Sequence, residues 1–285
     1  MKPLRVTVSG IGAWAAGFET WPAMRSALLG RPRASAASET RRPTPLLLPA
    51  AERRRVPDGV AVALEVAREA LAMAAERTDF DSRSMASVFA SAHGDLAIVD
   101  YLCATLASDP TQLSPTRFHH SVHNAAAGYW SIATPSFGPS TALAAGDASF
   151  ALGLLEAVTQ VIAEARPVLL VVFDTPAVGL LARAAPNTAL FGSALLLSPF
   201  ESGELLPGLS LSLDARVSSD PSPANEAFRG LAASSPAALA VALLERLARA
   251  VETTVDFAMD AASTIAVHVT PARVRTPADL HETIE

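Results

Sequence analysis

Cysteine is almost missing from this chain of 285 residues, and long apolar runs are missing altogether. The single cysteine, Cys103, excludes an internal disulfide and a metal cage built of cysteines. The first residues lack the charged and apolar regions of a signal peptide. No uncharged apolar run approaches the about 18 residues of a membrane span, and the stretch 167–173 is only as long as a strand. These absences predict a cytoplasmic protein without a membrane span.

Aromatic residues and an excess of basic charge are scarce as well. Only 6% of the residues are aromatic although 50% are hydrophobic, so we expect a core mostly of Ala, Leu and Val. The formal net charge of −6 argues against nucleic-acid binding. A local basic patch is present at Arg41, Arg42, Arg53, Arg54 and Arg55. We favour a solvated loop there, and the alternative is a docking site for an acidic carrier protein.

Strand patterns alternate with helix patterns along the chain, which predicts an α/β fold in a single domain. We expect strands over residues 4–12, 85–90, 168–173, 188–197, 205–217 and 264–270, with a turn at Gly10 and Gly12. We expect helices over residues 21–29, 59–76, 95–107, 148–165 and 236–255, and one that ends near 134.

The most informative stretch is residues 138–157. A turn at Gly138-Pro139, a short buried strand, an elbow at Gly146 and an apolar helix follow one another. Such a unit directs the first backbone N–H groups of the helix into a crevice, where they can receive negative charge. The residue at the elbow is Asp147.

This stretch resembles the nucleophile elbow of the β-ketoacyl synthases, in which a cysteine occupies the position of Asp147. The segments 5–12, 21–30 and 191–197 are similar to other parts of the same family, so the resemblance spans about residues 4–200. It implies a thiolase-like layered α/β sandwich within a single ketosynthase-like domain, residues 1–285. The first half would be complete over about 1–200 and the second half shortened over about 201–285.

Three departures separate the chain from an active synthase. Asp147 replaces the nucleophilic cysteine, the motifs that carry the family's two catalytic histidines are missing, and the second half is short. The chain therefore resembles the chain-length-factor branch, in the truncated form associated with aryl polyene biosynthesis. The resemblance implies a catalytically inactive subunit without cofactors that forms a heterodimer with an active ketosynthase. It also implies contact with acyl carrier protein through that complex.

The resemblance makes eight residues candidates for the tunnel or the subunit interface. They are Phe118, His119, His123, Asn124, Tyr129, Trp130, Asp147 and Phe150. Phe118, Tyr129 and Trp130 are the expected tunnel walls because bulky rings limit the depth of a tunnel. His119 and His123 are four apart and would share a helix face. Hydrogen bonding, an interface role and metal binding or catalysis stay open for this cluster, although no nearby cysteine or carboxylate completes a metal site.

Two polar residues at the elbow have a structural and a catalytic interpretation. For Asp147 we favour a helix cap over a nucleophile, because carboxylate acyl transfer would give a reactive anhydride. For Ser149 we favour a small packing residue, because its surroundings are not Gly-x-Ser-x-Gly. Cys103 lies on an apolar helix face, which predicts a buried thiol.

Two other functions remain as alternatives. The first is a stand-alone acyl-thioester hydrolase or acyltransferase that uses Asp147, Ser149 or His123. The second is a homodimeric scaffold or a module that binds carrier protein. Activity of the isolated chain would favour the first alternative, and a stable homodimer would favour the second.

Overall fold

The structure is a computed structural model that describes residues 2–31, 42–78, 80–185, 187–201, 205–214 and 221–272. Its centre is an eight-stranded sheet with the strand order β3-β2-β4-β5-β1-β6-β8-β7. The strands are β1 (Leu4–Ala15), β2 (Ala86–Ala90), β3 (Ser140–Leu143), β4 (Val168–Asp174), β5 (Phe191–Pro199), β6 (Gly208–Asp214), β7 (Thr253–Ala258) and β8 (Thr264–Thr270).

The long strand β1 joins the two halves of the sheet. It pairs with β5 of the first half along its length and, through Leu4–Thr7, with β6 of the second half; both pairings are antiparallel. β2 lies parallel to β3 and β4, whereas β4 and β5 are antiparallel. The second half is an antiparallel arrangement of β6, β8 and β7.

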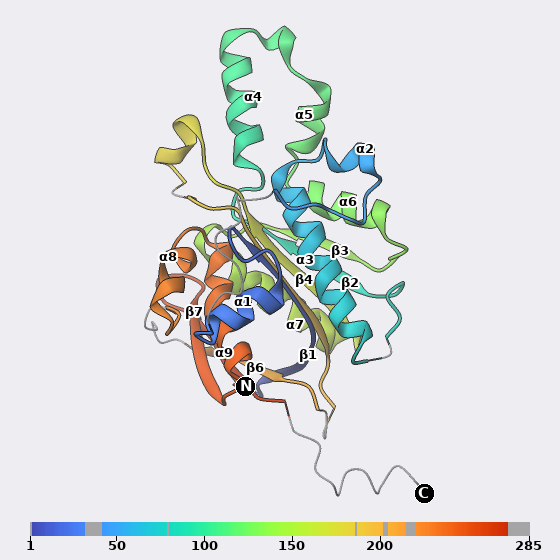
Figure 1. Ribbon diagram of the computed structural model, residues 1–285, viewed down its shortest axis with the longest axis vertical. Coiled ribbons are helices and arrows are strands. Elements are labelled where there is room, and N and C mark those ends of the chain that lie inside the picture. Colours follow the sequence, from blue (N-terminus) through green and yellow to red (C-terminus); the bar gives the residue numbers. More distant parts are fainter. Residues whose placement is uncertain are drawn as a thin grey trace, which may run out of the picture.

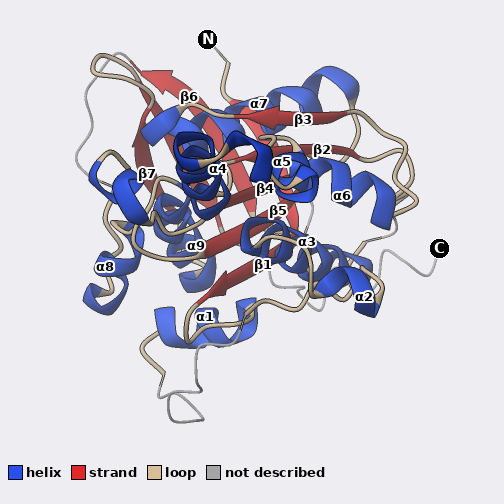
Figure 2. Cartoon of the chain, turned by 90° about the horizontal axis from the view of Figure 1, so that it is seen from above, coloured by secondary structure: helices blue, strands red, loops and turns tan. Residues whose placement is uncertain are grey.

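Helices cover the sheet in layers (Figures 1 and 2). The α-helices are α1 (Trp21–Leu28), α2 (Ala50–Arg53), α3 (Asp58–Ala75), α4 (Leu96–Ser108), α5 (Pro115–His120), α6 (Ala125–Ala133), α7 (Ser149–Glu164), α8 (Arg229–Ala232) and α9 (Ala240–Arg249). α3 and α6 pack on one face of the first half. α7 and α9 contribute to the core on the other face, together with strands of both halves. This arrangement is the expected layered α/β sandwich.

The expected turn at Gly10 and Gly12 is wrong, because β1 continues to Ala15. The glycines are needed for a close approach of α3 instead. A Cβ atom on Gly12 would lie 2.0 Å from the carbonyl oxygen of Val66, and one on Gly10 equally close to that of Ala70. The sheet shows a register shift between Val8 and Gly10.

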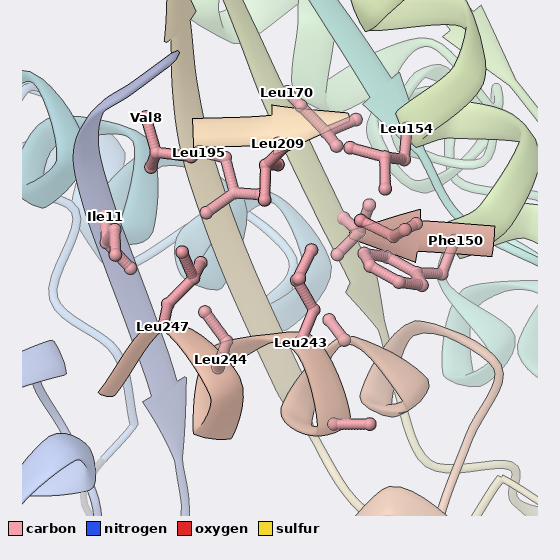
Figure 3. Close-up of a cluster of buried hydrophobic side chains, with 14 of the residues drawn as sticks. Val8, Ile11, Phe150, Leu154, Leu170, Leu195, Leu209, Leu243, Leu244 and Leu247 are labelled. Carbon is pink, nitrogen blue, oxygen red and sulfur yellow. The ribbon is translucent and has the colours of Figure 1, made fainter. Parts of the chain in front are cut away.

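The main core lies between the sheet and the helices α7 and α9 (Figure 3). Leu154 of α7 and Leu243 of α9 enter this core from separate helices, together with Leu195 of β5. The rings of Phe150 and Phe257 meet edge to face at 4.9 Å, which ties α7 to β7 in the second half.

The helix predicted over 236–255 is shorter than expected. α9 ends at Arg249, Ala250 adopts a left-handed φ of 52°, and β7 begins at Thr253. The run Thr253, Thr254 and Val255 is β-branched, which favours a strand. The missed strand β7 pairs with β8 and forms the second edge of the sheet.

Candidate functional site

The elbow has the predicted strand–turn–helix form. β3 leads into a short 3-10 turn, Gly146–Ala148, and α7 starts at Ser149. Gly146 has a φ of 54°, a left-handed conformation that glycine adopts without strain. The buried Ser149 hydroxyl accepts a hydrogen bond from the amide of Ala145 at 3.0 Å and donates one to the carbonyl of Gly146 at 2.7 Å. Ser149 therefore holds the elbow closed.

Asp147 is exposed at this elbow and is not the predicted helix cap. The N-cap position of α7 is Ala148, so Asp147 lies one residue too early, and neither the turn nor α7 has a side-chain cap. β3 also differs from the expected buried strand. It lies at the edge of the sheet, and its residues alternate between exposed and half-buried.

The histidines do not share a helix face, which corrects the expectation for His119 and His123. α5 ends at His120, and His123 lies in the turn before α6. His120 Nε2 is 2.9 Å from the Tyr129 hydroxyl, and His123 Nε2 is 2.9 Å from the carbonyl oxygen of Ser91. Among the residues that the structure describes, no three His, Cys, Asp or Glu side chains come together as a metal site.

Burial shifts the titration of the pair formed by His120 and Tyr129. Desolvation lowers the pKa of His120, and the charge of the neighbouring His119 lowers it further. Desolvation also raises the pKa of Tyr129. Both effects favour the neutral forms, which form a neutral hydrogen bond between α5 and α6.

A buried carboxylate, Asp174, lies at the end of β4, and no sequence motif singles it out as a site residue. It accepts hydrogen bonds from the Ser91 hydroxyl at 3.0 Å, the Ala92 amide at 3.0 Å and the Ala237 amide at 2.8 Å. Burial raises the pKa of Asp174, and the three donors oppose that shift. The signal for this residue was an acid directly after the apolar run 168–173. Asp174 links the end of β2, which His123 also contacts, to the segment before α9.

The helix α4 is joined to the body of the fold at its first turn, and further along the helix the Tyr101 ring packs against the guanidinium of Arg117 in α5. Asp95 accepts hydrogen bonds from Ile98 N at 3.2 Å and from Gly59 N at 3.4 Å, and burial raises its pKa. The amide of Leu96 donates to the Thr175 hydroxyl. Leu96 is the one fully buried residue of α4, and the helix projects from the body beside α5 (Figure 1).

Large apolar side chains are exposed along the segment that contains α4, α5 and α6. Ile132 is 83% exposed and Phe137 is 84% exposed. We call the following residues the exposed apolar set: Leu106, Phe118, Val122, Ile132 and Phe137. Cys103 is exposed on the same segment, so the predicted buried thiol is wrong. The apolar composition of α4 predicts burial, but the described part of the chain leaves Cys103 and Leu106 of this helix exposed.

The eight candidate residues are placed in different environments. Phe118, His119, Asn124 and Asp147 are exposed, and His123 and Tyr129 are half-buried. Trp130 is buried against Phe89, with ring centroids 6.3 Å apart, and Phe150 is buried against Phe257. The structure brings His119 and Tyr129 to one small cleft, beside Glu52 and Arg55. A role of these residues in a tunnel stays a prediction.

Two arginines of the basic patch, Arg42 and Arg53, stabilise the local structure. Arg42 pairs with Asp58, and its guanidinium also donates to backbone carbonyls of Arg53 and Val56. Arg53 donates to the carbonyl of Leu48. Arg54 and Arg55 are exposed, and Arg41 lies outside the described residues. The solvated-loop interpretation therefore fits Arg54 and Arg55 but not Arg42 and Arg53.

Solved structures with the same fold are ketosynthases and their complexes. One is a ketosynthase (ApeO) in complex with its chain length factor (ApeC) from Xenorhabdus doucetiae, with a TM-score of 0.65 and 23% identity, covering 93% of this chain and 99% of that chain. A second is the ishigamide ketosynthase/chain length factor, with a TM-score of 0.68 and 14% identity, covering 96% of this chain and 100% of that chain. A third is the AntDE:AntF complex of a type II polyketide synthase acyl carrier protein with its ketosynthase. Its TM-score is 0.67 at 12% identity, with 95% of this chain and 100% of that chain covered.

The fold is thus that of the thiolase-like ketosynthases. The sequence also matches the family model "Beta-ketoacyl synthase, N-terminal domain" over residues 29–204, which is more than half of the chain. The chain belongs to the β-ketoacyl synthase family. No curated protein matches the sequence. No helix among the described residues is long and apolar enough to cross a membrane.

Proposed function

We propose that this chain is a non-catalytic ketosynthase-like subunit, a chain length factor, that forms a heterodimer with an active β-ketoacyl synthase. The observation that carries the proposal is the exposed apolar set, of which Phe137 lies three residues before the edge strand β3. Monomeric proteins rarely expose large contiguous apolar patches, and an open strand edge is a further liability. A partner that covers the exposed apolar set and the edge of β3 would remove both liabilities from the surface.

The elbow supports the non-catalytic part of the proposal. By the resemblance of the elbow, Asp147 corresponds to the nucleophilic cysteine of the family. The Ser149 hydroxyl is engaged with the backbone on both sides of the elbow. The described part of the chain therefore offers no activated hydroxyl at this point. The elbow serves as a scaffold, and the partner carries out the chemistry.

The subunit acts by geometry in this proposal. It closes the far end of the partner's acyl tunnel, so that product length follows from the space left by its side chains in fatty-acid- or polyketide-type biosynthesis, including aryl polyenes. Two of the similar structures are ketosynthase–chain length factor pairs and a third holds an acyl carrier protein. We infer the same partners here, an active ketosynthase and, through the complex, acyl carrier protein, in the cytoplasm.

Co-purification with an active β-ketoacyl synthase from the same organism tests the pairing. We expect a one-to-one complex in light scattering after gel filtration. Ile132→Glu and Phe137→Glu place a charge in the interface and should each weaken the complex at least about tenfold. Val251→Glu is the matched control, because Val251 is exposed but lies outside the exposed apolar set. A stable homodimer of this chain that does not bind the ketosynthase would contradict the proposal and favour a homodimeric scaffold.

A further inference from the structure

A cleft of about 840 Å³ lies between α1, the end of α3, α9, the strands β1 and β8 and the segment 205–207 before β6. It is away from the helices α4 and α5, which project at the other end of the molecule (Figure 1). Its floor consists of apolar side chains from both halves of the fold: Ile11, Trp21, Met73, Leu247 and Val269. Figure 3 shows Ile11 and Leu247 at one end of the main core. A ligand that enters the cleft from solvent can therefore contact the edge of the main core.

The rim of the cleft carries positive charge only. Arg25 lies in α1, Arg31 follows α1, and Arg77 follows α3. No Asp or Glu of the described chain lines the cleft. The three guanidinium groups have no hydrogen bond or ion pair with any side chain or carbonyl that the structure describes. Other arginines, such as Arg68 and Arg249, are paired with carboxylates.

This arrangement is unusual because the whole chain is acidic. The sequence has 28 acidic and 22 basic residues, so its net charge is negative. The cleft, with its unpaired arginines, has the opposite sign of charge. Guanidinium groups bind carboxylates and phosphates with charge-assisted hydrogen bonds. An apolar floor at the same place requires a ligand with an apolar part.

We propose that this cleft binds an amphipathic organic anion, with a carboxylate head held by Arg25, Arg31 and Arg77 and an aliphatic tail laid on the floor. A medium-chain fatty carboxylate is the simplest ligand of this class, and its volume suits a cleft of this size. None of the elements that line the cleft belongs to the α4–α6 segment. The site is thus independent of the subunit interface proposed above.

Titration of the full chain with dodecanoate below its critical micelle concentration tests the site, by calorimetry and by tryptophan fluorescence. Trp21 lines the cleft, whereas Trp14 and Trp130 belong to the core on the other face of the sheet. We expect saturable binding that Arg25→Gln and Arg77→Gln each weaken about tenfold, since each removes one charge-assisted contact. Arg183→Gln is the control, because Arg183 is exposed and lies outside the cleft.

Dodecyltrimethylammonium carries a tail of the same length and the opposite charge. We expect it to bind at least about tenfold more weakly than dodecanoate. Equal binding of the two amphiphiles would overturn the proposal, since the tail alone would then account for binding. Absence of dodecanoate binding, or equal affinity of the Arg25→Gln, Arg77→Gln and Arg183→Gln variants, would overturn it as well.

Discussion

The Ser91 hydroxyl donates a hydrogen bond of 3.0 Å to Asp174, a carboxylate with no exposed surface. Asp174 also accepts from the amides of Ala92 and Ala237. One side chain thereby joins the end of β2, the end of β4 and the segment that leads to α9. The turn with His123 contacts the same loop, since His123 lies 2.9 Å from the Ser91 carbonyl oxygen.

Asp174→Asn should lower the free energy of unfolding by about 1–3 kcal/mol, because an amide has a single acceptor oxygen and would turn its N–H₂ group toward a backbone donor. Urea denaturation measures the change. Ser91→Ala is the graded control. It removes one of three donors, and we expect it to cost about 1 kcal/mol. An Asp174→Asn variant as stable as the wild type would show that the carboxylate is dispensable.

His120 should make stability depend on pH. Burial lowers its pKa in the folded state below the usual 6.5, so the unfolded chain binds the proton more tightly. The stabilisation from neutral His120 is complete above pH 6.5 and is lost as the pH falls through the lowered folded pKa. His120→Gln should reduce the loss of thermal stability in this window, as measured by Tm at several pH values.

The exposed His119 provides a graded comparison for this pH dependence. His119→Gln should reduce the slope of Tm against pH only in part, because burial is the first cause of the lowered pKa of His120 and the charge of His119 only adds to it. If His120→Gln keeps the full wild-type slope, another group causes the acid sensitivity.

Gly12 and Gly128 should respond to alanine in opposite directions. A Cβ atom on Gly12 would collide with the Val66 carbonyl, so Gly12→Ala should destabilise the chain by about 1–3 kcal/mol or more. Gly128 lies within α6 and has no heavy atom within 4 Å of an added Cβ. Gly128→Ala should stabilise the isolated chain by about 0.5–1 kcal/mol. Chemical denaturation of both variants tests this contrast, and equal effects would refute the close packing of α3 on β1.

Phe118 is the exposed one of the three expected tunnel walls. Phe118→Ala should change the stability of the isolated chain by no more than about 0.5 kcal/mol, because the ring is solvent-exposed there. In the complex with a ketosynthase, the same change should lengthen the products, since it opens space at the end of the tunnel. Mass spectrometry of the released chains measures product length. Val251→Ala is the control, and unchanged products with Phe118→Ala would remove Phe118 from the tunnel wall.

The parts of the fold that sequence patterns predicted are those with regular periodicity. The helix α3 and the buried strand β4 lie where the apolar spacing placed them. The elbow at Gly146 was predictable because a left-handed residue between a strand and a helix favours glycine. The strand β7 was missed because the helix-like apolar pattern of α9 continues into its first residues. The helix ends at Ala250, whose left-handed conformation the sequence alone does not indicate.

The candidate site was predictable in its position and less so in its contacts. The place of Asp147 at the elbow follows from local spacing. The pairing of His120 with Tyr129, and that of Asp174 with Ser91, depends on how distant elements pack, for which a single sequence holds no signal. Apolar composition also misled for Cys103, because α4 has the apolar composition of a buried helix and yet leaves this thiol exposed.

Reconstituted chain elongation tests the central claim most directly. Acyl and extender groups loaded on acyl carrier protein are given to this chain alone, to an active β-ketoacyl synthase from the same organism alone, and to both together. The proposal predicts no turnover by this chain, elongation to a defined length by the pair, and loss of that length control with Ile132→Glu. Turnover by this chain alone, or products from the ketosynthase that do not change when this chain is added, would contradict it.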